Sequence, residues 1–590
     1  MRHLFTLNHY FITYKWHLLG GIVFVTISVL FSVIPPQYVR ESFNAVEEAI
    51  RTNADHNTNS VTSETQALIL RYGLIIIGAA LLKGLFMFLM RQTLIVMSRH
   101  IEYDLKNEVY THYQKLSQRF FRANSTGDLM NRISEDVSRV RMYLGPALMY
   151  GINTSILVVV VIQRMIAINP TLTFYTLLPL PILSYLIYRV SHLINRRSER
   201  VQAQLSSIST FVQETLSGIR VLKANVQETY LAERYDQEAD EYFARNEHLY
   251  RINALFGPLM LLLVGLSTII IIYLGGMEAI AGNITIGNIA EFIMYVNMLT
   301  WPVASIGWVT SIVQRAEASM ERINVFLDEP PDITNPSDKP FVLEGNIRWD
   351  NVTFTYGHTN ITALKDVSFS VASGKTLAII GETGSGKSTV AALQTRLFDP
   401  TSGAIYIDGK DLLALNLDAY REQISIVPQD IFLFSDTIAN NIAFGVDNAR
   451  EEDIVDAAKM AGLHENIMAF PKGYQTRLGE RGVTLSGGQK QRTALARALI
   501  KKPKVLILDD CLSAVDTETE ERILRSLRSY TQSITTIIIS HRVSSVQHAD
   551  EILVLKKGQI TEQGTHADLM KADGYYSDIY EKQLREEQVV

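Results

Sequence analysis

The chain has 590 residues, of which 47% are hydrophobic and 20% are charged, and its formal net charge is -6. This length is too great for one hydrophobic core, so we expect more than one domain. No Lys/Arg block is long enough to follow a phosphate backbone, which argues against nucleic acid as a partner. The single cysteine, Cys511, excludes an intramolecular disulfide framework and is expected to be a small buried residue.

Long apolar runs fill the first half of the chain, and charged residues concentrate in the second half. A helix needs about 20 mostly apolar residues to cross a bilayer. The predicted spans are residues 17–39, 67–96, 143–163, 168–190, 255–273 and 286–308. Any single run would also suit a buried helix of a soluble protein, but six runs with paired spacing predict a transmembrane domain. The first run is too long for a signal peptide and lacks a small-residue cleavage site.

The segments between the predicted spans alternate in length and charge. Residues 40–64 are expected to form a polar, acid-rich loop, and Gly275-Gly276 with Gly282-Asn283 are expected to join the last two spans. In contrast, residues 91–142 and 191–251 are long, charged and typical of helices. Because Lys and Arg concentrate on the cytoplasmic side of membrane proteins, we place both long segments and both termini in the cytoplasm.

A charged helix and then Glu329-Pro330-Pro331 follow the last predicted span. Such a cluster of breakers ends a helix and begins a new domain. We therefore predict a transmembrane domain at 1–312, a linker at 313–343 and a soluble domain at 344–590. With the soluble domain in the cytoplasm, we expect the chain to lie in the cytoplasmic (inner) membrane.

The strongest motif of the soluble half matches G-x-x-x-x-G-K-[ST] in full. It follows the apolar strand 376–380 and precedes a helical stretch, which is the context that a phosphate-binding loop requires. Its glycines let backbone N–H groups close around phosphates. Lys387 supplies a positive charge to the β- and γ-phosphates, and Ser388 is a ligand for Mg²⁺. The predicted ATP-binding residues of this loop are Gly381, Glu382, Thr383, Gly384, Ser385, Gly386, Lys387, Ser388 and Thr389.

Two further segments of the soluble half suit a nucleotide. The apolar strand 504–508 ends in Asp509, the usual place for a carboxylate that holds Mg²⁺. Leu485, Ser486, Gly487, Gly488 and Gln489 begin a basic helix, whose N-terminus is a second site for anions. Because one ATP needs only one phosphate cradle, the economical explanation is that each domain lends its second cradle to the ATP of a partner.

With these motifs, the chain resembles a half-transporter of the ATP-binding cassette (ABC) exporters over essentially its whole length. The resemblance implies an all-α six-helix transmembrane domain with long cytoplasmic helical extensions, followed by an α/β P-loop nucleotide-binding domain of the ABC type. Residues 485–489 resemble the signature that caps ATP across the dimer. The other matching residues are Tyr356 (adenine stacking), Gln429 (sensing Mg²⁺ and the membrane domain), Gly479–Gly482 (contact with cytoplasmic loops), Ser513 and Asp516 (communication between sites) and His541 (γ-phosphate switch).

Two cytoplasmic segments also resemble family features. Residues 120–128 are similar to the first coupling region and residues 214–223 to the second. In the family, these short transverse helices dock on the nucleotide-binding domains, and the second is expected to reach the domain of the partner.

The chain departs from the family at Asp510, where a glutamate normally serves as general base. Aspartate is shorter by one methylene, and general-base catalysis needs about 2.6–3.2 Å between heavy atoms. A misplacement of about 1 Å can cost on the order of a hundredfold in rate. We therefore expect Asp510, Gln429 and His541 to form a slow catalytic site, while ATP and Mg²⁺ binding through Ser388, Gln429 and Asp509 is retained.

Family members with aspartate at this position are often one half of a heterodimer, so we favour a heterodimer; a homodimer that tolerates aspartate stays open. The predicted function is ATP-driven export of hydrophobic or amphipathic compounds or lipids by alternating access. The alternative is a regulatory subunit that hydrolyses little ATP and controls a catalytic partner. The six spans argue against a soluble DNA-repair or translation protein, and the fused domain order argues against import.

The sixth predicted span contains the features that bear on cargo. Its aromatic and methionine side chains suit an adaptable apolar surface, and plain helix packing explains them equally well. Ionisable groups within a span are costly and tend toward function. Three roles stay open for Glu291: pairing with a cationic compound, pairing with Lys83, or facing water near the outer rim.

Overall fold

The computed structural model describes residues 2–56, 63–357, 359–479, 482, 485–511, 519–520, 522–523, 525–527 and 534–587. The chain divides into two compact units. The first consists of Met1–Gln114 and Gly127–Glu329, and the second of Lys115–Thr126 and Pro330–Val590. The short segment Lys115–Thr126 therefore packs with the C-terminal unit, although it lies within the sequence of the first.

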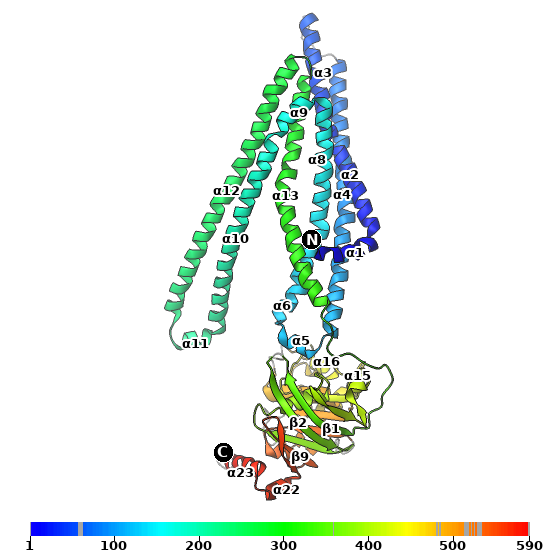
Figure 1. Ribbon diagram of the computed structural model, residues 1–590, viewed down its shortest axis with the longest axis vertical. Helices are drawn as coiled ribbons and strands as arrows, with labels where there is room; N and C mark the ends of the chain where they lie inside the picture. Colours follow the sequence, from blue (N-terminus) through cyan, green and yellow to red (C-terminus); the bar gives the residue numbers. More distant parts are fainter. Residues whose placement is uncertain are drawn as a thin grey trace. The chain divides into compact units, whose positions relative to one another are not determined.

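All the secondary structure described for the first unit is helical (Figure 1). Its elements are η1 (His3–Leu7), α1 (Asn8–Thr13), α2 (Lys15–Ser32), α3 (Ile34–His56), α4 (Ser63–Lys115), α6 (Thr126–Asn131), η2 (Arg132–Asp136), α7 (Val137–Met142), η3 (Tyr143–Ala147), α8 (Leu148–Ile168), α9 (Pro170–Leu177), α10 (Pro179–Ser217), α11 (Ile219–Ala224), α12 (Glu228–Ile280) and α13 (Ile286–Leu327).

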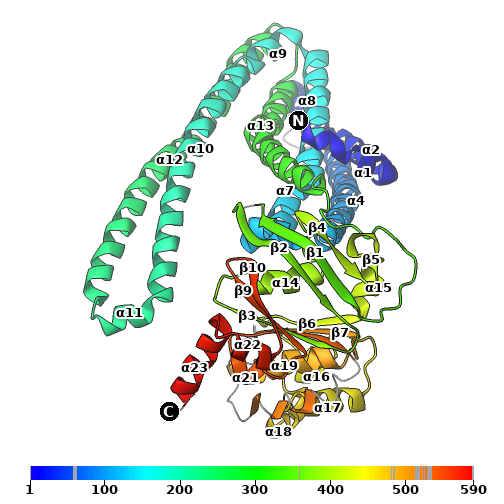
Figure 2. The ribbon, with the colours of Figure 1, turned by 60° about the horizontal axis from the view of Figure 1, so that its bottom comes forward.

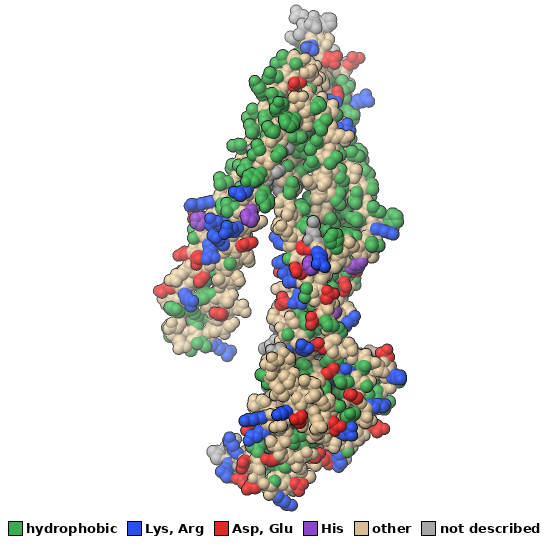
Figure 3. All heavy atoms as spheres, viewed as in Figure 1, with side chains coloured by type: hydrophobic (Ala, Val, Ile, Leu, Met, Phe, Trp, Pro, Cys, Tyr) green, Lys and Arg blue, Asp and Glu red, His purple; other side chains and the backbone are tan. Residues whose placement is uncertain are grey.

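Within the described residues, five helical stretches are long and apolar enough to cross a membrane. They are Lys15–Thr52, Glu64–Lys115, Thr126–Ile168, Glu228–Ile280 and Ile286–Leu327, and they contain five of the six predicted spans. The fourth predicted span falls on α9 and the start of α10, where several side chains lie outside the described set, and it stays a prediction. Figure 3 shows hydrophobic side chains gathered over the upper part of this unit and charged ones toward the lower ends of α10 and α12, as a membrane-spanning region requires.

Two expectations about connections are wrong. Residues 40–56 continue α3 instead of forming a loop, because the segment after Pro36 has no Gly or Pro and is rich in good helix formers. Gly275-Gly276 lies inside α12, whereas Gly282-Asn283 lies, as expected, in the connection 281–285 between the last two spans. A Cβ atom at Gly275 would lie 3.3 Å from Ile289 Cγ1, and this glycine therefore permits close packing of α12 and α13 rather than a turn.

The buried carboxylate Glu291 joins α3 to α13. Its side chain is 1% exposed, and Arg40 Nη1 donates a hydrogen bond to Glu291 Oε2 at 3.1 Å. The Tyr295 hydroxyl, one turn along α13, donates to Glu291 Oε1 at 2.8 Å. Glu291 therefore pairs with Arg40 and not with Lys83, and its burial contradicts the alternative in which it faces water. Buried charges are retained where they are paired and hydrogen-bonded, so this carboxylate holds two helices together.

Glu291→Gln is expected to lower the thermal stability of the full-length protein by the equivalent of about 1–3 kcal/mol, because it removes a charge-assisted hydrogen bond inside the helical unit. The midpoint of thermal unfolding in detergent measures this loss. The matched control is Glu48→Gln, on an exposed position of α3, which should leave the midpoint unchanged. An equal midpoint for wild type and Glu291→Gln would contradict the role of the pair.

The second unit contains two sheets (Figure 2). An antiparallel four-stranded sheet has the order β2-β1-β4-β5, and a six-stranded sheet has the order β10-β9-β3-β8-β7-β6. The strands are β1 (Ile347–Tyr356), β2 (Ile361–Val371), β3 (Thr376–Gly381), β4 (Ser402–Ile407), β5 (Lys410–Asp411), β6 (Ile424–Val427), β7 (Val505–Asp509), β8 (Thr535–Ile539), β9 (Glu551–Lys556) and β10 (Gln559–Gly564).

The helices of the second unit complete an α/β architecture, as predicted. They are α5 (Gln118–Ala123), α14 (Lys387–Gln394), η4 (Leu412–Ala414), α15 (Leu417–Glu422), α16 (Ile438–Ala443), α17 (Glu451–Met460), α18 (His464–Met468), η5 (Gly473–Gln475), α19 (Gly487–Leu499), α21 (Val543–Val546), α22 (His566–Lys571) and α23 (Tyr575–Glu587). Strand β7 is buried along its whole length, and β3 and β8 are nearly so, as expected for parallel strands covered on both faces.

Candidate nucleotide-binding site

The carboxyl ends of four parallel strands meet at one edge of the larger sheet. Strand β8 lies between β3 and β7, with Ile539 opposite both Ile379 and Asp509. Strand β6 continues the sheet, with Val427 opposite Leu508. Residues that follow these strands are therefore brought together although they are distant in the sequence. Ligands of open α/β sheets bind at this edge.

A cavity of about 580 Å³ lies at this edge, within the size range of small-molecule sites. Its lining brings together most of the predicted site residues, which come from β1, from the loop after β3 and from the ends of β6, β7 and β8. They are Tyr356, Thr383, Gly384, Gly386, Lys387, Ser388, Thr389, Gln429, Asp509, Asp510 and His541.

The predicted phosphate-binding loop runs from β3 into α14. Gly384 and Gly386 have φ angles of +81° and +102°, which favour glycine. A Cβ atom at Gly386 would lie 2.4 Å from the carbonyl oxygen of Ala363, so no larger residue fits there without a shift of the backbone. The loop therefore has the conformation in which backbone N–H groups at a helix N-terminus bind an anion.

Lys387 is the buried cation of this loop, with 5% of the residue exposed. Its Nζ donates hydrogen bonds of 2.8 Å to the carbonyl oxygens of Gly381 and Glu382. Burial lowers the pKa of Lys387 to about 8, and the nearby carboxylates Asp510, Asp509 and Glu382 oppose that shift. The ammonium group is therefore mainly charged at neutral pH, as binding of a polyphosphate requires.

The residues that suit Mg²⁺ lie beside the loop. The Ser388 hydroxyl donates to Asp509 Oδ1 at 3.1 Å, which joins the start of α14 to the end of β7. Burial raises the pKa of the Asp509 carboxyl, whereas the Ser388 hydrogen bond lowers it. Mg²⁺ is usually held by one or two protein oxygens together with substrate phosphates and water, and this hydroxyl–carboxylate pair fits that donor set.

Asp510 takes up a left-handed backbone conformation, with φ of +47°, directly after β7. Its N–H donates to the carbonyl oxygen of Ile539 at 2.8 Å, and Gln429 Nε2 lies 3.5 Å from Asp510 Oδ2. Aspartate and asparagine tolerate this backbone region better than most residues. Asp510 therefore lies next to Gln429 at the cavity, where a general base would be needed.

Tyr356 and His541 complete the described lining that the sequence predicts. The Tyr356 ring packs edge-to-face with Phe354 and Phe398, and its hydroxyl lies 3.1 Å from Thr389 Oγ1. The backbone carbonyl of His541 accepts a hydrogen bond of 2.7 Å from Gln583 Nε2, which ties the loop after β8 to α23. Both side chains therefore line the cavity from supported positions.

The signature segment lies elsewhere in the chain's own domain. Ser486 caps α19: its side chain accepts from the Gln489 N–H at 3.3 Å, and Gln489 Oε1 accepts from the Ser486 N–H at 2.9 Å. No residue of 485–489 is among the described lining of the cavity. Ser513 and Asp516 lie outside the described residues, as do Glu480 and Arg481 of the segment Gly479–Gly482.

Sequence reasoning missed Arg122 as a residue of this cavity. It belongs to α5, far from the nucleotide motifs in the sequence, yet it lines the cavity together with the phosphate-binding loop. No motif or spacing reports such a contact, because it depends on how α5 packs within the second unit.

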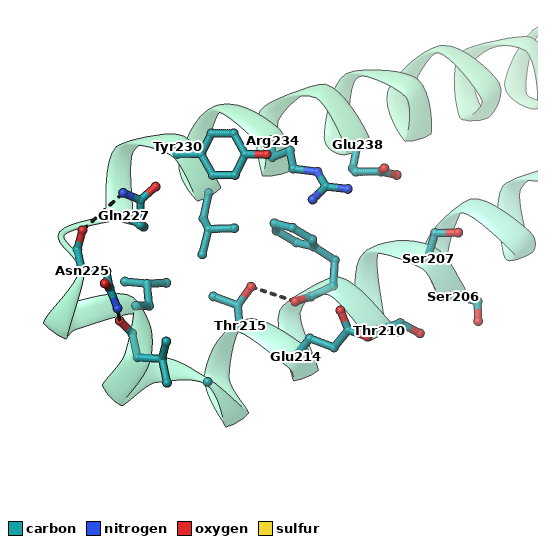
Figure 4. Close-up of a pocket in the computed structure, with 15 residues that line it drawn as sticks. Ser206, Ser207, Thr210, Glu214, Thr215, Asn225, Gln227, Tyr230, Arg234 and Glu238 are labelled. Carbon is teal, nitrogen blue, oxygen red and sulfur yellow. Dashed lines mark hydrogen bonds between the residues drawn. The ribbon is translucent and has the colours of Figure 1, made fainter.

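A larger cavity, of about 1020 Å³, lies between α10, α11 and α12 of the first unit (Figure 4). Arg234 of α12 lies over the ring of Phe211 of α10, with Cζ 5.8 Å from the ring centroid. The described lining of this cavity carries none of the nucleotide motifs. Size alone therefore does not identify the ATP site, which is assigned from its chemistry.

Comparison with known proteins covers both units. Residues 18–303 match the family model described as "ABC transporter transmembrane region", and residues 364–513 match the one described as "ABC transporter". The "Multidrug resistance-like ATP-binding protein MdlA" of Escherichia coli is 34% identical over 587 residues, which are 99% of this chain and 97% of the relative. The "ATP-dependent lipid A-core flippase" of Chromohalobacter salexigens is 32% identical over 528 residues, 90% of this chain and 91% of the relative.

A solved structure agrees with these relatives. The structure of a bacterial Atm1-family ABC exporter with ATP bound matches with a TM-score of 0.79 and 28% sequence identity, covering 96% of this chain and 98% of that one. The helical unit and the α/β unit thus agree with relatives that extend over nearly the whole chain. The chain belongs to the ABC transporter family, as an ATP-hydrolysing exporter with a transmembrane region followed by a nucleotide-binding domain.

Proposed function

We propose that the chain is one half of a dimeric exporter that moves hydrophobic or amphipathic compounds, or lipids, across the cytoplasmic membrane by alternating access. The observation that carries the dimer is the composition of the ATP cavity. It gathers the phosphate-binding loop, the Mg²⁺ residues and Asp510, whereas Leu485–Gln489 caps a helix outside its described lining. A second copy of the signature, from a partner, would complete the site.

The proposed cargo rests on the relatives and on the apolar character of the spans. One relative is named multidrug resistance-like and another a lipid A-core flippase. On α13, Phe292 and Tyr295 are fully buried and therefore serve helix packing, whereas Trp301 and Trp308 are 62% and 42% exposed. Exposed aromatic side chains along a span suit lipid or an apolar cargo. Glu291 forms an ion pair with Arg40 and is not part of the proposed cargo site.

The proposed orientation places the nucleotide-binding unit and both termini in the cytoplasm. It is supported by the basic residues of the long segments around α4–α7 and α10–α12, since Lys and Arg favour the cytoplasmic side. Helix α11 is short and joins two long helices, as expected for the second coupling region. We propose that the cavity between α10, α11 and α12 belongs to the surface that meets the partner half.

A heterodimer is favoured over a homodimer because of Asp510, which replaces the usual glutamate. In such a pair, the intact signature of this chain would complete a competent ATP site on the partner's phosphate-binding loop. The alternative function, a regulatory subunit with little hydrolysis of its own, rests on the same residue. The two functions differ in ATP turnover: brisk turnover by the purified chain alone would contradict the regulatory subunit.

The proposal is tested in lipid vesicles that contain the full-length chain, alone or with a co-expressed sister half-transporter. We expect ATP, but not ADP, to drive transport of a lipophilic cationic dye or movement of a fluorescent lipid between leaflets. The control is vesicles of the same lipid composition without protein. If vesicles that hydrolyse ATP move neither probe in either assembly, the hydrophobic-cargo proposal is wrong.

A further inference from the structure

Helix α5 is fixed against the α/β unit by polar contacts at its N-terminal end. The Ser117 hydroxyl donates to Asp332 Oδ2 at 2.9 Å, and Arg119 Nη1 lies 3.6 Å from Asp332 Oδ1. These contacts belong to the second unit, which contains Lys115–Thr126. These contacts, which do not involve Arg122, therefore hold α5 beside the start of the nucleotide-binding domain.

Arg122, one turn further along α5, lies over two aromatic rings of the ATP cavity. Its Cζ atom is 5.5 Å from the centroid of Tyr356 and 5.3 Å from the centroid of Phe398. The two rings are nearly perpendicular, with an interplanar angle of 87°. A guanidinium within about 6 Å of a ring centroid is attracted by the ring quadrupole, and its planar shape also allows stacking.

Arg122 and an adenine base would use the same ring. Tyr356, Arg122 and Lys387 line one cavity, so the guanidinium and a nucleotide bound in that cavity would share the space beside the same ring. A flat base that stacks on Tyr356 requires the area that the guanidinium covers. The phosphates, in contrast, bind at the glycine-rich loop and do not compete for the ring.

We propose that an adenine base displaces Arg122 from Tyr356. Stacking of adenine on this ring releases the Arg122 guanidinium, so that α5 responds to the base of the bound nucleotide. This inference rests on the proposed ATP site. Helix α5 directly follows the long helix α4 in the sequence and precedes α6. The displacement of Arg122 thereby makes the first coupling region, residues 120–128, respond to the base rather than to the phosphates.

The test measures the dissociation constants of ATP and of inorganic tripolyphosphate with the full-length protein, by calorimetry in the absence of turnover. Arg122→Ala is expected to tighten ATP binding about two- to fivefold, the effect of one partly exposed cation–π contact, and to leave tripolyphosphate binding unchanged. The matched control is Gln118→Ala, at an exposed position of the same helix and outside the described lining, which should change neither constant. In a Tyr356→Leu background, Arg122→Ala should no longer tighten ATP binding.

Unchanged or weaker ATP binding by Arg122→Ala would overturn the proposal, as would an equal change for ATP and tripolyphosphate. A gain that persists in the Tyr356→Leu background would also overturn it, because the effect would not act through the ring. Failure of the ATP site itself is distinguishable. In that case the wild-type protein would bind neither ligand. If only the proposed displacement fails, both dissociation constants of the wild type stay measurable and neither changes in Arg122→Ala.

Discussion

Asp510→Glu is expected to raise the ATPase rate of the full-length chain by up to about a hundredfold, because it restores the reach that a general base needs. Asp510 lies 3.5 Å from Gln429 at the end of β7, on the edge where the predicted metal and phosphate residues meet. Its carboxylate therefore lies at the edge of the proposed ATP site, and it is one methylene shorter than the glutamate that the resemblance to the family implies there. The dissociation constant of ATP should not change, since Lys387, Ser388 and Asp509 are untouched.

The matched control is Asp510→Asn, which keeps the size of the side chain and removes the base. Its ATPase rate should fall below that of the wild type, and its ATP affinity should be retained. The measurement is steady-state phosphate release by the chain alone and with a sister half-transporter. Brisk turnover by the wild-type chain alone, unaffected by Asp510→Glu, would contradict the slow site and remove the ground on which a heterodimer is favoured.

Lys387→Ala is expected to lower ATP turnover by about 10²–10³-fold, the usual cost of removing one preorganised group that stabilises transition-state charge. Lys387 is buried, and the carbonyl oxygens of Gly381 and Glu382 hold its ammonium group at the phosphate-binding loop. Its removal also leaves the buried carboxylate Asp509 beside a polyphosphate with less positive charge. Binding of both ATP and tripolyphosphate should weaken.

Lys557 provides the comparison for Lys387, because it is an exposed lysine that lines the same cavity from the turn between β9 and β10. Lys557→Ala should change the ATPase rate far less than Lys387→Ala does, since an exposed charge is largely screened. Equal losses in the two variants would show that general positive charge, rather than the position of Lys387, governs the reaction. Melting curves of both variants separate lost activity from lost folding.

The apolar spans and the nucleotide motifs were predictable because the residues that define them are close together in the sequence. The phosphate-binding loop needs a strand, glycines with positive φ and a helix start, and all lie within residues 376–394. The cap of α19 likewise depends on Ser486 and Gln489 alone. Residues 40–56 contradict the prediction of a loop because polar composition alone does not distinguish a loop from an exposed helix, and no helix breaker is present there.

The amino-acid sequence by itself determined the two domain types and the chemistry of the ATP site, since local patterns carry both. Only the tertiary structure decided that Glu291 pairs with Arg40, that Gly275 of α12 packs against α13, and that Arg122 lies over Tyr356. These contacts join residues far apart in the chain, or depend on which face of a helix is covered. Hydropathy and motif spacing report the residue types but not their partners, because partners are fixed by packing.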